Sequence, residues 1–224
     1  MYVKNIAHDL LNGTKLDKAT FDRARLGGRQ LPGGFKIVKA IHVEDSALWR
    51  RYINKCKEIN KKSGAIKPIQ VKIDEYLPQD MFESLNEEVN EVYLFHGTSM
   101  EAAKSISKTG FKIELAGKAA GTAFGKGAYF AERSTKSDEY TVAETVNGES
   151  HYAMLLCRVC LGEIYRIIDF DLSAERHVLE SGGRYHSLLG DREASSSQSY
   201  REFIVYEEDQ VYPEYVIIYK TCEE

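Results

Sequence analysis

The chain has 224 residues, of which 43% are hydrophobic and 29% charged, and its formal net charge is −4. This is the composition of an ordinary globular protein, with enough residues for one large domain or two small ones. At this length about 70% of the unfolded surface can be buried, so a core needs no support from a metal or a disulfide. The acidic net charge gives the chain as a whole no electrostatic footprint for nucleic acid.

Basic residues are concentrated in one segment. Between Arg50 and Lys72 eight lysines and arginines occur, and Glu58 is the only acid. Such a segment could bind phosphates or an acidic partner. We favour the interpretation that the segment is a solvated helix face followed by a loop, because runs of charged residues usually lie on solvent-exposed surfaces.

No targeting or membrane segment is visible. Residues 1–11 lack the basic stretch and apolar run of a secretory signal, and no apolar stretch approaches the roughly 18–20 residues that cross a bilayer. We therefore expect an intracellular protein, in the cytoplasm or nucleus, without a membrane partner.

Cys157 and Cys160 have the C-x-x-C spacing of many metal sites. They lie in the apolar run Tyr152–Cys160, which is typical of a strand, and residues three apart on a strand point to opposite faces. No second C-x-x-C or suitably spaced histidine pair completes a zinc site. We expect buried free thiols, no metal and a reducing compartment.

The first elements follow a polar N-terminal segment, residues 1–34, which ends in a Pro-Gly-Gly loop signal. Alternating hydrophobic residues from Phe35 to Val43 predict a strand. Ser46 is the expected N-cap of a helix. The apolar stripe of that helix comprises Leu48, Trp49, Tyr52, Ile53, Cys56 and Ile59. A loop is expected over residues 61–70.

The middle of the chain carries a short apolar strand, Tyr93–Phe95, with His96 at its end. Thr98 and Glu101 match a capping box, which predicts a helix ending at Gly110. Residues rich in glycine and alanine follow, and we interpret 111–124 as a mobile loop.

Beyond this loop the pattern predicts a strand over Gly127–Ala131 and a helix from Ser134 or Thr135 to about Val146. Further strands are expected near 152–160, 163–168, 202–206 and 210–220. The polar stretch Ser181–Gln198 is predicted to be a surface loop. Together these elements predict an α+β fold of mostly antiparallel strands.

Three short segments place a histidine, a tyrosine and a glutamate at the ends or edges of apolar strand-like runs. They are His96-Gly97-Thr98, Gly125–Ala131 and Arg201–Tyr206. Only a folded domain can bring them together. In this order and with these neighbours they resemble the His-Tyr-Glu signature of the ADP-ribosyltransferases related to poly(ADP-ribose) polymerase (PARP).

The resemblance covers about Leu31 to Lys220 and implies the ADP-ribosyltransferase fold, with split, mostly antiparallel sheets and flanking helices over residues 35–224. It implies NAD⁺ as co-substrate. In the family the histidine holds the adenosine ribose and the next glycine holds the carboxamide, which points to His96 and Gly97. Thr98, beside them, is included among the expected NAD-binding residues.

The remaining matched positions are Tyr129, Ser137, Tyr140 and Glu202. The resemblance implies that the tyrosines and the serine hold nicotinamide. It implies that the glutamate binds the nicotinamide ribose and activates the acceptor, which would be a protein or the enzyme itself. The expected catalytic set is His96, Tyr129 and Glu202.

These residue types suit cleavage of the nicotinamide–ribose bond. The leaving group is already cationic and the transition state resembles an oxocarbenium ion, so the site needs aromatic surfaces and an anion more than a strong acid. Tyr129 and Tyr140 can stack on the ring, and Ser137 and Tyr140 would share a helix face. Gly97 leaves room for a flat ligand at its backbone. Glu202 would act on the developing positive charge.

Several alternatives stay open. Glu202 leaves chain elongation possible, although in the family this glutamate is necessary rather than sufficient for polymer, and mono-transferring members often have an apolar residue there. The 34 N-terminal residues are too few for the helical regulatory domain of DNA-activated members, which suggests constitutive activity or control by another chain. A non-catalytic NAD or ADP-ribose reader and a toxin-like transferase are the other readings.

Overall fold

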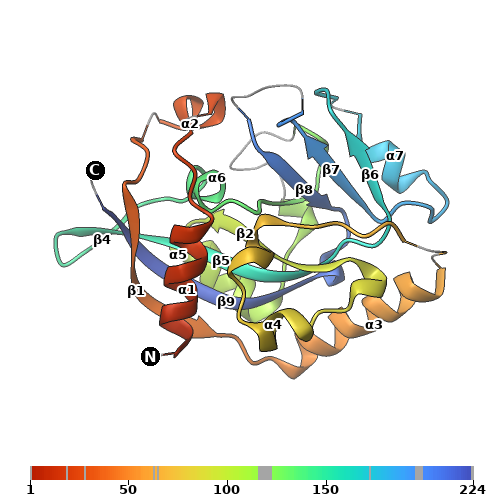
Figure 1. Ribbon diagram of the computed structural model, residues 1–224, viewed down its shortest axis with the longest axis horizontal. Coiled ribbons are helices and arrows are strands. Elements are labelled where there is room, and N and C mark those ends of the chain that lie inside the picture. The colour runs from red at the N-terminus through yellow and green to blue at the C-terminus, as the bar shows by residue number, and fades with distance from the viewer. Residues whose placement is uncertain are drawn as a thin grey trace.

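The computed structural model describes residues 2–18, 20–27, 29–62, 64, 66–115, 123–171, 173–194 and 199–222. The strands gather at the centre of the molecule and the helices surround them (Figure 1). The helices are α1 (Tyr2–Gly13), α2 (Phe21–Arg25), α3 (Ser46–Lys62), α4 (Gln79–Glu83), α5 (Met100–Thr109), α6 (Ser134–Asp138) and α7 (Glu175–Leu179). The strands are β1 (Gly34–His42), β2 (Glu91–Thr98), β3 (Ala128–Phe130), β4 (Glu144–Val146), β5 (Glu149–Cys160), β6 (Ile164–Ile167), β7 (Ser187–Asp191), β8 (Arg201–Val205) and β9 (Val211–Cys222).

The strands form two sheets. One has the order β1-β9-β5-β2, with β4 paired to β5, and the other has the order β3-β8-β7-β6. Every named pair is antiparallel except β6 with β7. The sheets meet at a bridge between Phe95 and Ala131, which brings the edge of β2 against the end of β3. The expected α+β fold with split antiparallel sheets is confirmed.

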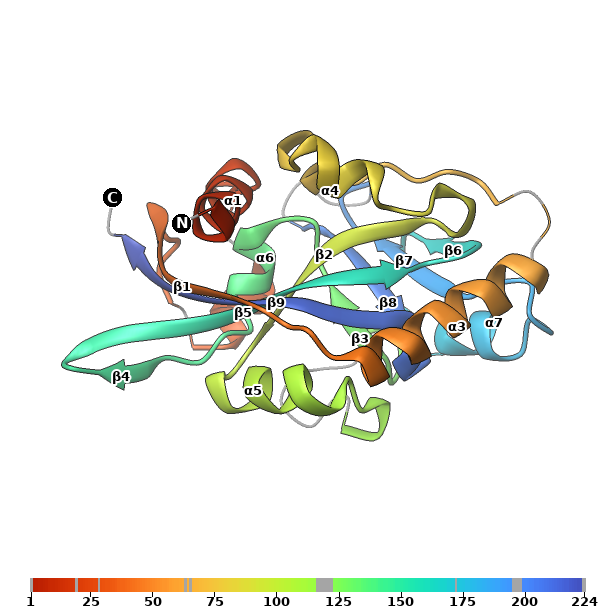
Figure 2. The ribbon, with the colours of Figure 1, turned by 90° about the horizontal axis from the view of Figure 1, so that it is seen from below.

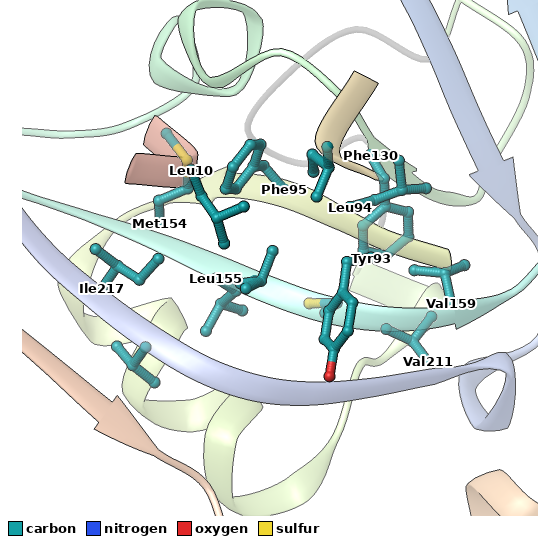
Figure 3. Packing of buried hydrophobic residues seen from close by; sticks show 14 of the residues in the cluster. Leu10, Tyr93, Leu94, Phe95, Phe130, Met154, Leu155, Val159, Val211 and Ile217 are labelled. Carbon is teal, nitrogen blue, oxygen red and sulfur yellow. The ribbon is translucent and has the colours of Figure 1, made fainter. Parts of the chain in front are cut away.

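The main core lies on both faces of the first sheet. Figure 2 shows α1 and α4 on one side of this sheet and α3 and α5 on the other. Strand β5 is therefore buried continuously from His151 to Cys160. Figure 3 shows Leu10 of α1 packed among strand residues that include Phe95 and Met154. The polar N-terminal segment thus contributes an amphipathic helix whose apolar residues, Ala7, Leu10 and Leu11, belong to the core.

The cysteines are arranged as the strand pattern predicts. Cys157 lies in the main core, whereas Cys160 packs on the opposite face with Tyr52 and Cys56 under α3. All four cysteines are free, and Cys56, Cys157 and Cys160 are buried. Within the described ranges, no cluster of three or more histidine, cysteine or acidic side chains is placed to hold a metal ion. In the same part of the chain, no helix has the length and apolar character to cross a bilayer.

Strand β1 confirms the predicted strand over Phe35–Val43, with one departure in its pattern. A β-bulge between Ile37 and Lys39 adds a residue to this strand and reverses the alternation beyond it. Ile41, expected on the buried face, is consequently 37% exposed.

Two predicted helix caps are wrong by one residue. Asp45, and not Ser46, caps α3, because its Oδ1 accepts from the N–H groups of Ala47 and Leu48. Ser99, and not Thr98, caps α5 through a bond from the Ala102 N–H. Thr98 is unavailable because β2 continues through it. The predicted end of α5 at Gly110 is confirmed.

The helix predicted from Ser134 to about Val146 is wrong beyond Asp138, where α6 ends. Residues Glu144–Val146 instead form β4, which pairs with the start of β5. The turn between these strands is Asn147-Gly148, and both residues have positive φ. An Asn-Gly pair favours such a two-residue hairpin turn, so the signal was present in the sequence.

The surface loop predicted over Ser181–Gln198 is also wrong in part. It contains β7, whose five residues are all buried between β8 and β6. Residues 195–198 lie outside the described residues. So do residues 116–122, which are half of the predicted mobile loop, and residues 113–115 before them form a 3₁₀ turn.

The basic segment is largely a solvated helix face, as favoured from the sequence. Arg51 and Lys57 are exposed on α3. Arg51 pairs with Asp209, and Lys55 pairs with Glu58 and with Glu207 at 2.5 Å. Arg51 and Asp209 are both nearly half exposed, and an exposed pair of this kind is usually worth less than about 1 kcal/mol.

Candidate active site

His96 lies within β2, where the first sheet meets the second. Its Nδ1 is 2.8 Å from the backbone carbonyl oxygen of Tyr129. A carbonyl oxygen only accepts, so Nδ1 carries the hydrogen and Nε2 remains an acceptor. The ring packs against Phe111 and Phe130, and burial lowers the pKa of His96, while the bond to Tyr129 opposes that shift. The histidine is therefore neutral and fixed in one tautomer.

Tyr129 is anchored by its own hydroxyl group. The hydroxyl donates to the carbonyl oxygen of Gly125 at 2.8 Å and accepts from the Phe124 N–H at 2.9 Å. Burial raises the pKa of Tyr129 above its usual range, and the charge of Glu202 adds to that effect. The phenol stays protonated and its ring cannot swing away without losing both bonds.

Glu202 is the second residue of β8 and is 5% exposed. Tyr129 pairs directly with Ile204, so Glu202, two residues earlier, lies diagonally from Tyr129 on the same face of the second sheet. The Glu202 carboxylate is 3.6 Å from the ammonium group of Lys136. Among the described residues, this is its one ion-pair partner.

Gly97 and Ser137 are in direct contact. A Cβ atom added to Gly97 would lie 1.7 Å from the backbone oxygen of Ser137, so no side chain fits at this position. Packing alone therefore requires a glycine here, because α6 lies so close to β2, and the expected access for a flat ligand at the Gly97 backbone stays a prediction. The Ser137 hydroxyl donates to the carbonyl oxygen of Phe95 at 3.1 Å, which leaves its lone pairs free to accept.

Tyr140 lies in the turn after α6, so the prediction that it shares a helix face with Ser137 is wrong. The Tyr140 N–H instead bonds to the Ser137 carbonyl oxygen at 3.1 Å, which still holds the two residues together. The Tyr140 hydroxyl accepts from Lys136 at 3.0 Å and donates weakly to Asp22 at 3.4 Å. Burial raises the pKa of Tyr140, and the charge of Glu202 raises it further.

Sequence comparison with known proteins assigns the chain to a family. The sequence pattern of the poly(ADP-ribose) polymerase catalytic domain matches residues 32–221. The chain belongs to this family. It is 31% identical to human protein mono-ADP-ribosyltransferase PARP12 over 196 residues, which is 88% of this chain and 23% of that protein. It is 25% identical to mouse protein mono-ADP-ribosyltransferase PARP11, covering 96% of this chain and 58% of that protein.

A plant relative, poly [ADP-ribose] polymerase 2 of Arabidopsis thaliana, is 27% identical over 162 residues, which is 62% of this chain and 25% of that protein. The chain thus spans about a quarter of PARP12 and of the plant polymerase. PARP enzymes use NAD⁺ as the donor of ADP-ribose. The residues expected to form the site of this PARP domain come from four elements. His96, Gly97 and Thr98 lie on β2, Tyr129 lies on β3 and Glu202 lies on β8. Ser137 lies in α6, and Tyr140 follows that helix.

Sequence reasoning missed Lys136, which is buried at the centre of the site. Burial by itself would lower the pKa of this lysine, but the carboxylates of Glu202, Glu139 and Asp22 and the hydroxyl of Tyr140 raise it well above the usual value. Its spacings to Glu139 and Tyr140 are i,i+3 and i,i+4, so these two contacts could have been expected from a helical pattern.

The N-terminal segment was also missed as part of the site. Thr20 Oγ1 donates to Glu139 at 2.6 Å, and the buried Arg23 pairs with Asp138 at 3.1 Å. Arg29 pairs with the same Asp138 carboxylate. More than a hundred residues separate these partners in the sequence, and no motif links them.

Proposed function

We propose that this PARP domain transfers ADP-ribose from NAD⁺ to an acceptor by cleaving the nicotinamide–ribose bond. The observation that supports this best is the buried Glu202 carboxylate on the same sheet face as Tyr129. A carboxylate in such a poorly hydrated position acts on developing positive charge with little screening by water.

The residues around Glu202 suit the two ends of NAD⁺. His96 Nε2 would accept a hydrogen bond from the adenosine ribose, because Nδ1 is already engaged by Tyr129. The Ser137 hydroxyl would accept from the carboxamide N–H, because its own hydrogen is donated to Phe95. The rings of Tyr129 and Tyr140 would stack on nicotinamide, and the Gly97 backbone and Thr98 would complete the pocket.

In the transfer step, the C–N bond between ribose and nicotinamide breaks and nicotinamide leaves as a neutral molecule with the bonding pair. Glu202 would bind the 2′-hydroxyl of the ribose and stabilise the oxocarbenium ion. An acceptor oxygen then bonds to the anomeric carbon, and its proton passes to Glu202 and on to water. The acceptor would be a side chain of another protein, of this chain itself, or a growing ADP-ribose chain.

Two product classes fit this site. Glu202 is the residue that chain elongation needs, and the plant relative is named a polymerase. The PARP11 and PARP12 relatives are named mono-transferases. Incubation with labelled NAD⁺ followed by separation of products by size decides between them, since a ladder means polymer and one shifted band means mono-transfer.

The catalytic unit in this proposal is residues 35–224, with α1 packed against its first sheet and α2 in contact with α6. Nicotinamide release from NAD⁺ tests the activity directly. A protein that binds NAD⁺ and releases no nicotinamide would be a reader, and the proposal would then be wrong.

A further inference from the structure

The Lys136 ammonium group stands between Glu202 and the N-terminal segment. It donates to Asp22 at 2.9 Å, to Glu139 at 3.0 Å and to the Tyr140 hydroxyl at 3.0 Å. An ammonium group has three N–H donors, so these partners use all of them. Glu202, at 3.6 Å, is within ion-pair distance and beyond hydrogen-bonding distance.

We propose that Asp22 is a positioning residue of the active site. Together with Glu139 it holds Lys136 back from Glu202, so that both Glu202 oxygens stay free for the ribose hydroxyl and the acceptor. The positive charge of Lys136 then lies close to the Glu202 carboxylate, and Lys136 forms no hydrogen bond to it. This inference rests on the proposed function and names a contribution of the N-terminal segment to the same site.

The position of Asp22 is specified by buried contacts on both sides of it. Thr20 caps α2 through the Arg23 N–H and donates to Glu139. Arg23 is 4% exposed and donates to the carbonyl oxygen of Thr135 at 2.8 Å. Before Thr20, the Tyr200 hydroxyl donates to the carbonyl oxygen of Lys18 at 2.9 Å. The segment is thus held to α6, which carries Lys136. It is also held to Tyr200, the residue just before β8, and β8 carries Glu202.

Without the negative charge of Asp22, Lys136 would be held less strongly on that side, because a neutral oxygen binds an ammonium group more weakly than a carboxylate does. The nearest remaining anionic oxygen that Lys136 does not already bond is that of Glu202. Closing the gap from 3.6 Å to the ~2.9 Å of an ordinary N–H···O bond takes about 0.7 Å, which a lysine side chain can supply by small rotations. Glu202 would then have to break that bond before it could bind ribose.

The test is Asp22→Asn, which keeps the shape of the side chain and removes its charge. We expect kcat/KM for nicotinamide release to fall about tenfold, mostly through kcat, because Glu202 acts most strongly in the transition state. Asp22→Glu should restore most of the activity. Asp17→Asn is the matched control, since Asp17 lies on the same segment with a side chain 68% exposed, paired with Lys15, and it should leave kcat/KM unchanged.

A double-mutant cycle with Lys136→Met shows whether Asp22 acts through Lys136. In that background Asp22→Asn should cost less than about twofold. An equal cost in both backgrounds, or an equal loss in Asp17→Asn, would overturn the inference. Thermal melts identify any variant that fails to fold.

Crystal structures of the parent and of Asp22→Asn give a readout that needs no activity. The Nζ–Oε1 distance between Lys136 and Glu202 should shorten to hydrogen-bonding length in the variant, and an unchanged distance would sink the inference. If the parent releases no nicotinamide, the proposed function fails, and this distance still decides the role of Asp22.

Discussion

His96 of the first sheet and Tyr129 of the second are joined by a hydrogen bond from the imidazole Nδ1–H to a backbone carbonyl oxygen, 2.8 Å long. The acceptor belongs to the main chain, so it stays in place when the Tyr129 side chain is changed. The two ends of the proposed NAD⁺ site are therefore held together through the backbone of β3, next to the bridge between Phe95 and Ala131.

Glu202→Gln should keep NAD⁺ binding and lose most transfer. The amide preserves the size of the side chain and removes the charge that stabilises the oxocarbenium ion. A loss of about 100-fold or more in kcat is expected, which is similar to the loss when one oxyanion-hole donor is removed from another enzyme. Automodification at the parental rate would show that the role assigned to Glu202 is wrong.

Gly97→Ala should destabilise the fold and abolish NAD⁺ binding. The new Cβ would lie 1.7 Å from the Ser137 oxygen, so β2 and α6 would have to separate. A cost of about 3 kcal/mol in the free energy of unfolding is expected, at the upper end for overpacking. Gly64→Ala is the control, because a Cβ there meets nothing within 4 Å. Equal melting temperatures for the two variants would contradict the packing argument.

His96 should make the protein less stable in acid. Burial lowers its pKa, so below the ordinary value of about 6.5 the unfolded chain binds a proton that the folded chain does not. Stability therefore falls as the pH drops through about 6.5, and it is regained as the pH rises.

His96→Gln cannot titrate, so its free energy of unfolding should fall less than the parent's between about pH 7.5 and pH 5.5. Denaturant titrations at both pH values measure the difference. His8→Gln, with a side chain 59% exposed, is the control. If His96→Gln keeps the parental pH dependence, the partly buried His96 is not its source.

Arg23→Met should be strongly destabilising. Arg23 is 4% exposed, and its partner Asp138 has a fully buried side chain. Removing one member of a buried pair leaves the other charge uncompensated, and we expect a cost of about 3 kcal/mol, since Arg29 still pairs with Asp138. Arg25→Met, whose side chain is 44% exposed in its pair with Asp22, should cost less than about 1 kcal/mol. Chemical denaturation of both variants checks the contrast.

Much of the strand framework could be predicted, because its sequence pattern depends on burial alone. Strands β1, β5 and β9 are long apolar or alternating runs, and their approximate bounds follow from the pattern. Strand β7 could not be found in the same way. Its five residues include one serine, one glycine and one aspartate between polar neighbours, and only pairing with β8 and β6 shows that they are buried.

The site residues that belong to a short sequence motif could be predicted. The site contacts between residues far apart in the sequence could not. His96, Gly97 and Tyr129 lie within such motifs. The end of α6 depends on the turn from Ser137 to Tyr140 and on the contact with Gly97, which a helical pattern does not encode. Asp22 reaches Lys136 only because α1 and α2 fold back over α6, and no local pattern indicates this.

The packing of α1 sets a practical limit on how the domain can be trimmed. The family match begins at residue 32, yet Leu10 and Leu11 are fully buried against the sheet. A fragment that starts at the match would uncover the apolar surface beneath α1, and exposed patches of this kind promote aggregation. The unit recognisable by sequence is therefore smaller than the unit whose core is complete.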